Sequence, residues 1–177
     1  QPPARGVGGG TWGKLERRVG RVIAPSVRAA IEAATSSPIA SAHEVGGGSI
    51  AATSVVTLAD GRKAFLKTDP NAPASAFAAE ARSLRFIAEP RALRVPEVLA
   101  VGEGAGDEAF LLLEHVATGQ PAKDHDDVLG HGLAAMHRAS PPRFGGATDA
   151  GCLAGITTDD RSTPDAATFY AERRLIP

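Results

Sequence analysis

The order in which strand and helix patterns follow one another is the feature that most restricts the fold of this chain. Strand patterns occupy residues 39–45, 50–58, 63–68, 98–101 and 109–116, and a helical pattern occupies 74–88. One helix among five strands is not the regular strand–helix alternation that parallel, doubly wound sheets require. The order therefore predicts an α+β fold, in which an antiparallel sheet of about five strands packs against one helix.

Weaker signals mark the segments around this sheet. Asp60 and Gly61 form a dipeptide typical of a tight hairpin turn between the second and third strands. Ser26 is suited to cap a short helix that runs to about residue 35. Residues 139–163 are dominated by proline, glycine, aspartate and threonine, so we expect mostly loop there.

A second clear helix is predicted over residues 126–138 and indicates the start of a helical region. Its apolar side chains, which share one face, are Val128, Leu129, Leu133 and Met136. Such a face is normally covered by a helical partner. Without one, we expect the chain to self-associate or aggregate through this helix.

Charge and composition exclude several classes of protein. The 177 residues include 19 Lys and Arg against 20 Asp and Glu, which argues against nucleic-acid binding through a broad basic surface. No apolar run approaches the roughly 18 residues of a membrane span, so we expect no membrane partner. Cys152 is the only cysteine, which excludes an internal disulfide framework and a cysteine-based zinc site.

The first residues are basic and poor in acids. Between residues 1 and 28 the only acidic side chain is Glu16, whereas the basic ones are Arg5, Lys14, Arg17, Arg18, Arg21 and Arg28. This segment could be the remainder of an organellar transit peptide, which would place the protein in a plastid or another organelle. We favour the alternative, in which residues 1–25 form a disordered leader of a cytoplasmic protein.

A glycine-rich turn, a strand lysine and a helix glutamate follow one another in the predicted sheet region. Gly46, Gly47 and Gly48 carry no Cβ, so their N–H groups can approach phosphate oxygens. Lys67 lies among apolar neighbours in the third strand and needs a partner, which Glu80 on the next helix can supply. In protein kinases such a lysine binds the ATP phosphates, and such a glutamate forms an ion pair with the lysine.

Each of these features also has an ordinary explanation. The glycines could form a plain loop, Lys67 could be a solvated edge-strand lysine, and Glu80 could be a solvated helix residue. Their order and spacing together favour a kinase-like nucleotide-binding lobe. In that interpretation the last strand runs into a hinge, where Glu114 and Val116 offer backbone groups to an adenine ring.

From residue 26 onward the sequence resembles the fructosamine kinase (ketosamine-3-kinase) family, which includes the protein-ribulosamine 3-kinases. The matching segments are residues 45–50, 64–68, 77–84, 94–98, 112–116, 129–137 and 169–177. The last of them, Phe169-Tyr170-Ala171-Glu172-Arg173-Arg174-Leu175-Ile176-Pro177, is similar to the family's FYxERRLxP stretch and is the most specific. The family consists of small-molecule kinases with a protein-kinase-like fold.

The resemblance implies ATP-dependent phosphorylation of the sugar 3-hydroxyl of a ketosamine on a glycated protein, a repair step that leads to release of the free amine. It implies ATP and Mg²⁺ as cofactors, with residues 46–49 over the nucleotide, Lys67 on its phosphates and Glu80 holding Lys67. Residues 26–116 would then be the nucleotide-binding lobe, and residues 117–177 the hinge and the beginning of a helical C-terminal lobe. Alternatives on the same fold are an aminoglycoside- or choline-kinase-like phosphotransferase and a non-catalytic module that binds nucleotide or a partner protein.

The chain also departs from the family pattern. Ser49 stands where many members carry a cysteine, and residues 157–161 match the family's TPQxN stretch poorly. In the family the aspartate that acts as base and the metal-binding aspartate follow the FYxERRLxP stretch. We therefore expect both downstream of Pro177, assign no catalytic residue within these 177 residues, and expect the chain alone to bind ATP weakly and not to phosphorylate a ketosamine.

Overall fold

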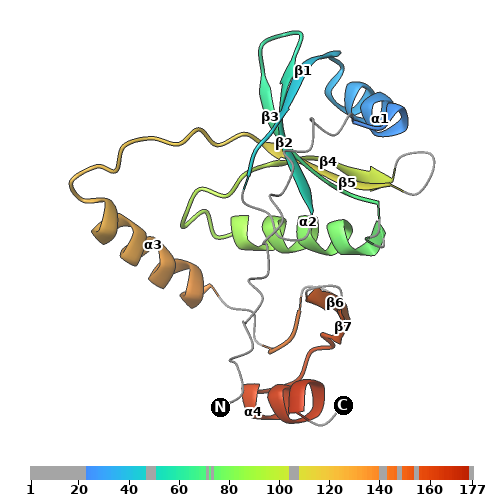
Figure 1. The fold of residues 1–177 in the computed structure, drawn as a ribbon. Coiled ribbons are helices and arrows are strands. Elements are labelled where there is room, and N and C mark those ends of the chain that lie inside the picture. The colour runs from blue at the N-terminus through green and yellow to red at the C-terminus, as the bar shows by residue number, and fades with distance from the viewer. Residues whose placement is uncertain are drawn as a thin grey trace, which may run out of the picture.

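A five-stranded antiparallel sheet forms the centre of the molecule (Figure 1). The computed structural model describes residues 23–46, 51–70, 72, 74–103, 108–139, 143–146, 149–153 and 156–175. The strands are β1 (Ile39–Glu44), β2 (Ala52–Leu58), β3 (Lys63–Asp69), β4 (Val98–Glu103) and β5 (Ala109–Glu114), in the order β1-β2-β3-β5-β4. Helix α2 (Ala74–Ala88) connects β3 to β4. The predicted α+β class is confirmed.

Both faces of the sheet are covered by a helix. The first five residues of β5 are all buried: Ala109, Leu111 and Leu113 pack with α2, while Phe110 and Leu112 belong to the core on the opposite face. That opposite face is covered by α1 (Pro25–Thr35) (Figure 1). A strand buried on both faces reads as a continuous apolar run, which explains why β5 lacks polar alternation.

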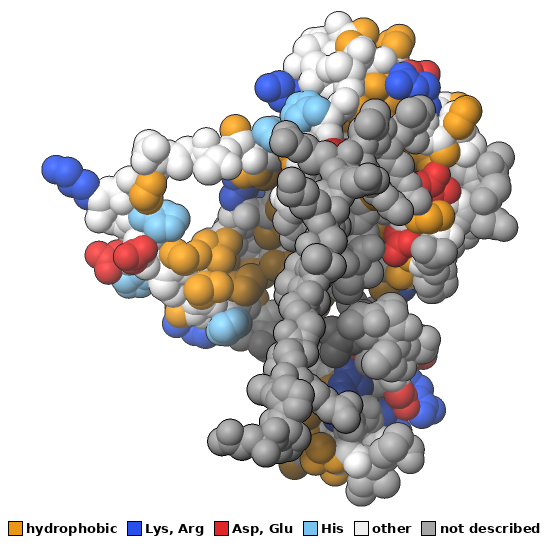
Figure 2. Space-filling view, viewed as in Figure 1, with side chains coloured by type: hydrophobic (Ala, Val, Ile, Leu, Met, Phe, Trp, Pro, Cys, Tyr) orange, Lys and Arg blue, Asp and Glu red, His pale blue; other side chains and the backbone are white. Residues whose placement is uncertain are grey.

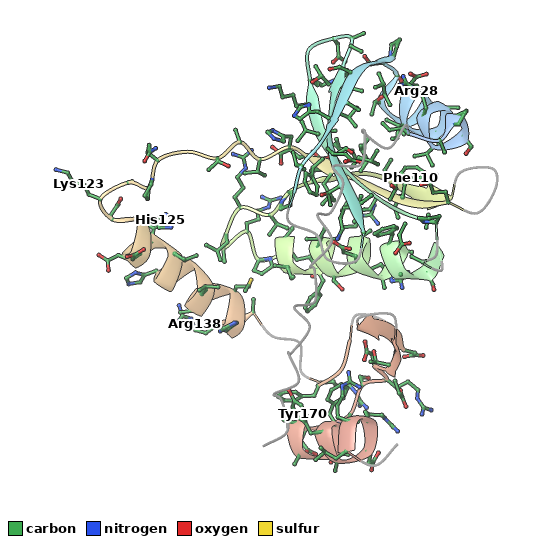
Figure 3. All side chains as sticks on the ribbon, viewed as in Figure 1. Arg28, Phe110, Lys123, His125, Arg138 and Tyr170 are labelled. Carbon is green, nitrogen blue, oxygen red and sulfur yellow. The ribbon has the colours of Figure 1, made fainter. Side chains whose placement is uncertain are left out.

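Helix α1 is fastened to the start of β1 by side-chain hydrogen bonds. Arg28 Nη1 donates to the Ile39 carbonyl at 3.1 Å, and the Ile39 N–H donates to Glu32 Oε1 at 2.9 Å. Figure 3 labels Arg28 on this helix and Phe110 on the sheet beneath it. The predicted cap at Ser26 is wrong: the helix begins at Pro25, with Ala24 in the capping position, because proline fits the first helical turn where no N–H is needed.

The turn between β2 and β3 forms where the sequence predicts it. Gly61 has a φ of 86°, in the left-handed region, and the Asp60 carboxylate accepts a hydrogen bond from the Arg62 N–H at 3.0 Å. The strand before it begins two residues later than predicted, at Ala52, and the last strand of the sheet ends at Glu114.

Helix α3 (His125–Arg138) follows an extended segment and touches the rest of the chain near Gly132. A Cβ built on Gly132 would collide with the Leu93 side chain, so the helix backbone lies directly against the α2–β4 connection. Val128, Leu129 and Leu133 remain 60%, 40% and 38% exposed. Figure 2 shows apolar side chains gathered over this region. Self-association through this face stays a prediction.

Residues 139–163, predicted as mostly loop, contain a hairpin, and a short helical segment follows them. Strands β6 (Ala150–Leu153) and β7 (Ile156–Asp159) form an antiparallel hairpin, followed by α4 (Ala166–Tyr170) and the π-helical turn η1 (Ala171–Leu175). Ion pairs join η1 to the end of β7: Arg174 contacts Asp160 at 2.5 Å and Arg173 contacts Asp159 at 3.5 Å. No helix in the described ranges is both long and apolar enough to cross a bilayer.

Candidate functional site

Lys67 and Glu80 form an ion pair between the middle of the sheet and α2. Lys67 Nζ lies 2.7 Å from Glu80 Oε1 and 2.8 Å from Oε2. The Lys67 and Glu80 side chains are 24% and 37% exposed, so the pair is half-buried. The predicted pairing of these two residues is confirmed.

Two periodicities bring the charged ends together. Along β3 the side chains of Ala64 and Leu66 belong to the core on the α1 face, and Phe65 belongs to the core on the α2 face. Because neighbouring strand residues point to opposite faces, Lys67 follows Phe65 toward α2. Glu80 lies one helical turn after the buried Phe77, which directs it to the same side of α2.

Phe77 provides a contact that the sequence interpretation missed. The Lys67 Nζ lies 5.8 Å from the centroid of the Phe77 ring, within cation–π range. From the sequence, Phe77 was identified only as a residue of the predicted helix over 74–88. The signal for its second role is its position three residues before Glu80, since residues at that spacing share a helix face.

The start of the glycine-rich turn lies level with Lys67 in the sheet. The Val45 N–H donates to the Thr53 carbonyl at 3.0 Å, and Thr53 Oγ1 donates to the Val45 carbonyl at 2.7 Å. Thr53 in turn is the register partner of Lys67. Two strand spacings of about 4.8 Å thus put the entrance of the turn about 10 Å from the Lys67 backbone. Gly46 is exposed, whereas Gly47, Gly48 and Ser49 lie outside the described residues.

The end of β5 has an unusual hydrogen-bond pattern. The Glu114 N–H donates to the Glu97 carbonyl at 2.8 Å, whereas the Glu97 N–H donates to the Glu114 carboxylate at 3.4 Å. Arg94 Nη2 lies 2.5 Å from the same carboxylate. The Arg94 hydrogen bond, supported by the Glu97 N–H, holds the pKa of Glu114 below its ordinary value, although partial burial opposes this shift.

This hydrogen-bond pattern determines which backbone groups of the predicted hinge are available to bind a ligand. The Glu114 N–H is used within the sheet, so of the two backbone groups of Glu114 only the carbonyl can serve an incoming ligand. In a regular antiparallel ladder the Glu97 N–H would donate to that carbonyl. Here the Glu97 N–H donates to the Glu114 side-chain carboxylate instead. Val116 follows the strand and is 44% exposed. Arg94 was not predicted to take part in this arrangement.

The described residues offer a cation and hydrogen-bonding groups but no metal site. Within those ranges, no three His, Cys, Asp or Glu side chains gather in a way that could hold a metal ion. A separate groove of about 430 Å³ lies between the ends of α2 and α3, lined by Phe86, Ile87, Glu89, Pro90, Met136, His137 and Ala139. It contains neither Lys67 nor Glu80 and belongs to a different part of the surface.

A five-stranded antiparallel sheet whose central lysine is paired with a glutamate on the packed helix defines a protein-kinase-like N-terminal lobe. The sequence model of the family described as fructosamine kinase matches residues 23–177. The chain belongs to this kinase family.

Named relatives agree with this assignment. A probable ketoamine kinase of Synechocystis is 35% identical over 121 residues, covering 67% of this chain and 40% of the relative. A probable ketoamine kinase of Klebsiella aerogenes is 32% identical over 124 residues, covering 65% of this chain and 40% of the relative. The chain thus spans less than half the length of these curated relatives.

Solved structures share the fold. The crystal structure of a putative fructosamine-3-kinase from Thermobifida fusca is 32% identical, with a TM-score of 0.69, and the match covers 86% of this chain and 52% of that one. A putative fructosamine-3-kinase from Haemophilus somnus has a TM-score of 0.73 over 85% of this chain and 51% of that one. Its identity is 20%, so it supports the fold alone.

Proposed function

We propose that this chain is the nucleotide-binding part of an ATP-dependent ketosamine kinase. Residues 26–116 hold the nucleotide, and residues 117–177 form the hinge and the beginning of a second, helical lobe. The observation that carries the proposal is the half-buried ion pair between Lys67 and Glu80. Because the ion pair already holds the ammonium in place, no free energy is spent on reorienting it when phosphates bind.

The ion pair leaves Lys67 able to bind a nucleotide. A lysine ammonium has three N–H donors, and the two Glu80 oxygens engage it from one side at 2.7 and 2.8 Å. The remaining donor capacity is directed to phosphate oxygens of ATP. The turn of residues 46–49 covers the phosphates from the neighbouring strands, a role that stays a prediction for Gly47, Gly48 and Ser49.

The hinge supplies the adenine contacts. The Glu114 carbonyl accepts from the exocyclic amine of the base, and the Val116 backbone continues the edge contact. The register puts Glu114 opposite Ala64, three residues along β3 from Lys67. Three residues of strand correspond to about 10 Å. The base and the phosphates of one extended nucleotide can therefore reach the hinge and Lys67 together.

The acceptor in this proposal is the 3-hydroxyl of a ketosamine on a glycated protein amine. The γ-phosphoryl group moves from ATP to the sugar oxygen, releasing ADP and a proton. The phosphoester then destabilises the adduct and frees the amine. The names of the relatives, ketoamine kinase and fructosamine-3-kinase, support this substrate class.

Mg²⁺ accompanies ATP in this family of reactions, and among the described residues no three His, Cys, Asp or Glu side chains gather to hold a metal ion. We assign the magnesium ligands and the catalytic base to the part of the relatives' length that this chain does not span. We therefore derive no step through the metal. We expect the 177 residues alone to bind ATP weakly and not to transfer phosphate.

The test is phosphate transfer from labelled ATP by the protein as its gene encodes it. The acceptors are a ribulosamine peptide, the same peptide without the sugar, and an aminoglycoside. Lys67→Met should lower kcat about 100-fold, the scale of losing one group that stabilises transition-state charge. Lys63→Met is the matched control, because Lys63 lies on the same strand and is exposed. Transfer to the aminoglycoside alone, or full activity of Lys67→Met, would contradict the proposal.

A further inference from the structure

We propose that Phe77 is a positioning residue for Lys67: its ring fixes the ammonium between a carboxylate and an aromatic face, so that the ammonium meets the nucleotide phosphates from one direction. This inference rests on the proposed function, since it concerns the same lysine. Phe77 would act through Lys67 and would not touch the nucleotide itself.

The geometry of three side chains carries the inference. Lys67 Nζ has both Glu80 oxygens within 2.8 Å, and its distance to the Phe77 ring centroid is 5.8 Å. Phe77 and Glu80 are separated by one helical turn, so α2 presents the ring and the carboxylate as one surface. The lysine tip therefore contacts two groups of the same helix, one charged and one aromatic.

Burial restricts the position of the ring. Phe77 is 5% exposed and packs with Ala81, Leu111 and Leu113 in the core between α2 and the sheet. The faces of an aromatic ring carry negative partial charge, so the ring attracts the ammonium. It offers no conventional hydrogen-bond acceptor, so the N–H groups of Lys67 stay available to other oxygens. A leucine at this position would fill much of the same space without that attraction.

The first experiment weakens the negative partial charge on the ring face while nearly keeping the shape of the ring. Phenylalanine analogues with one, two or three fluorine atoms replace Phe77 in the protein as its gene encodes it. The readouts are the affinities for a non-hydrolysable ATP analogue and for adenosine. We expect affinity for the ATP analogue to fall stepwise, to about fivefold with three fluorines, whereas adenosine affinity stays unchanged because adenosine has no phosphates. Fivefold corresponds to about 1 kcal/mol, the usual scale of a cation–π contact.

A control separates positioning from folding. Leu84 packs against the same core cluster as Phe77. Leu84→Ala should lower the unfolding midpoint while leaving affinity for the ATP analogue within about twofold. Equal loss of ATP-analogue and adenosine affinity in the fluorinated proteins would mean that Phe77 acts on the fold as a whole, and would overturn the proposal. An ATP-analogue affinity that stays the same with one, two and three fluorine atoms would also overturn the proposal.

The second experiment needs no nucleotide. A double-mutant cycle combines Phe77→Leu with Lys67→Met and measures the unfolding equilibrium constant. We expect a non-additive change of about fivefold, against additivity for Phe77→Leu with Lys63→Met. Failure of the unmodified protein to bind the ATP analogue would overturn the proposed function and the nucleotide part of this inference. Additivity at Lys67 would overturn the ring–ammonium contact itself.

Discussion

Replacement of Gly132 by alanine tests how α3 meets the rest of the chain, and Gly130 supplies a matched control on the same helix. A Cβ at Gly132 would collide with the Leu93 side chain, approaching its Cγ to 2.8 Å and the Ala92 carbonyl oxygen to 3.0 Å. A Cβ at Gly130 meets nothing within 4 Å. Only the first substitution therefore changes packing.

The magnitudes follow from two opposing effects. Alanine favours a helix interior over glycine by about 1 kcal/mol at either position. Overpacking costs about 1–3 kcal/mol, and a carbonyl oxygen cannot swing aside as a side-chain tip can. Gly130→Ala should thus stabilise α3 by about 1 kcal/mol. In the Gly132→Ala variant α3 should be about 1–3 kcal/mol less stable than in the Gly130→Ala variant.

Amide hydrogen exchange of the α3 residues is the assay of choice, because a helix at the edge of a structure can open without global unfolding. Urea unfolding of both variants accompanies it. Leu93→Ala combined with Gly132→Ala should recover part of the lost protection, since the colliding side chain is removed while the Ala92 carbonyl oxygen stays. Equal stabilisation by the two glycine substitutions would refute the close approach of α3 to the α2–β4 connection.

Three further outcomes are expected. Ile31→Ala should cost about 2–5 kcal/mol in urea unfolding because Ile31 is fully buried in the α1 face, whereas Val128→Ala, at 60% exposure, should change stability by less than about 0.5 kcal/mol. Gly61→Ala should cost about 1 kcal/mol or more, because its φ of 86° is strained for alanine; a neutral result would contradict the turn. Hydrogen bonding from Arg161 lowers the pKa of Asp159 below its ordinary 3.8, so the ionised group stabilises the fold above that pH and this contribution disappears as pH falls through the lower folded pKa. Asp159→Asn should therefore be less stable than the wild type near neutral pH and converge with it in acid; a constant difference at all pH values would contradict the argument.

Much of the site could be predicted because it depends on local periodicity. Lys67 follows apolar neighbours along a strand, and Glu80 lies one helical turn after the apolar Phe77 on the next helix. The face of the strand that carries Lys67 and the face of the helix that carries Glu80 therefore follow from the sequence pattern.

The hinge pattern was harder to predict. It depends on Arg94 and Glu97, in the connection before β4, meeting Glu114 at the end of β5. A side-chain carboxylate that accepts a backbone N–H in place of a carbonyl cannot be recognised from either segment alone.

The hairpin of β6 and β7 was missed for a different reason. Its strands are four residues each and lack an alternating apolar pattern, and β6 contains Gly151. Its end is instead held by arginines that come more than ten residues later, with Arg174 bound to Asp160 and also stacked 4.6 Å from the centre of the Phe169 ring. Turn-rich composition predicts loop where charge pairing between distant segments supplies the order.

The register of β3 ties the site to the helix on the far side of the sheet. Leu66 is buried against the α1 face, and its neighbour Lys67 therefore points to α2. A slip of one residue would turn every side chain of the strand over, moving Lys67 into an apolar core and Leu66 toward Glu80. A charge left unpaired in that core is far costlier than a displaced leucine. The apolar contacts of α1 involve Leu66 and not Lys67, Glu80 or Phe77, yet they keep Lys67 on the face where Glu80 and Phe77 contact it.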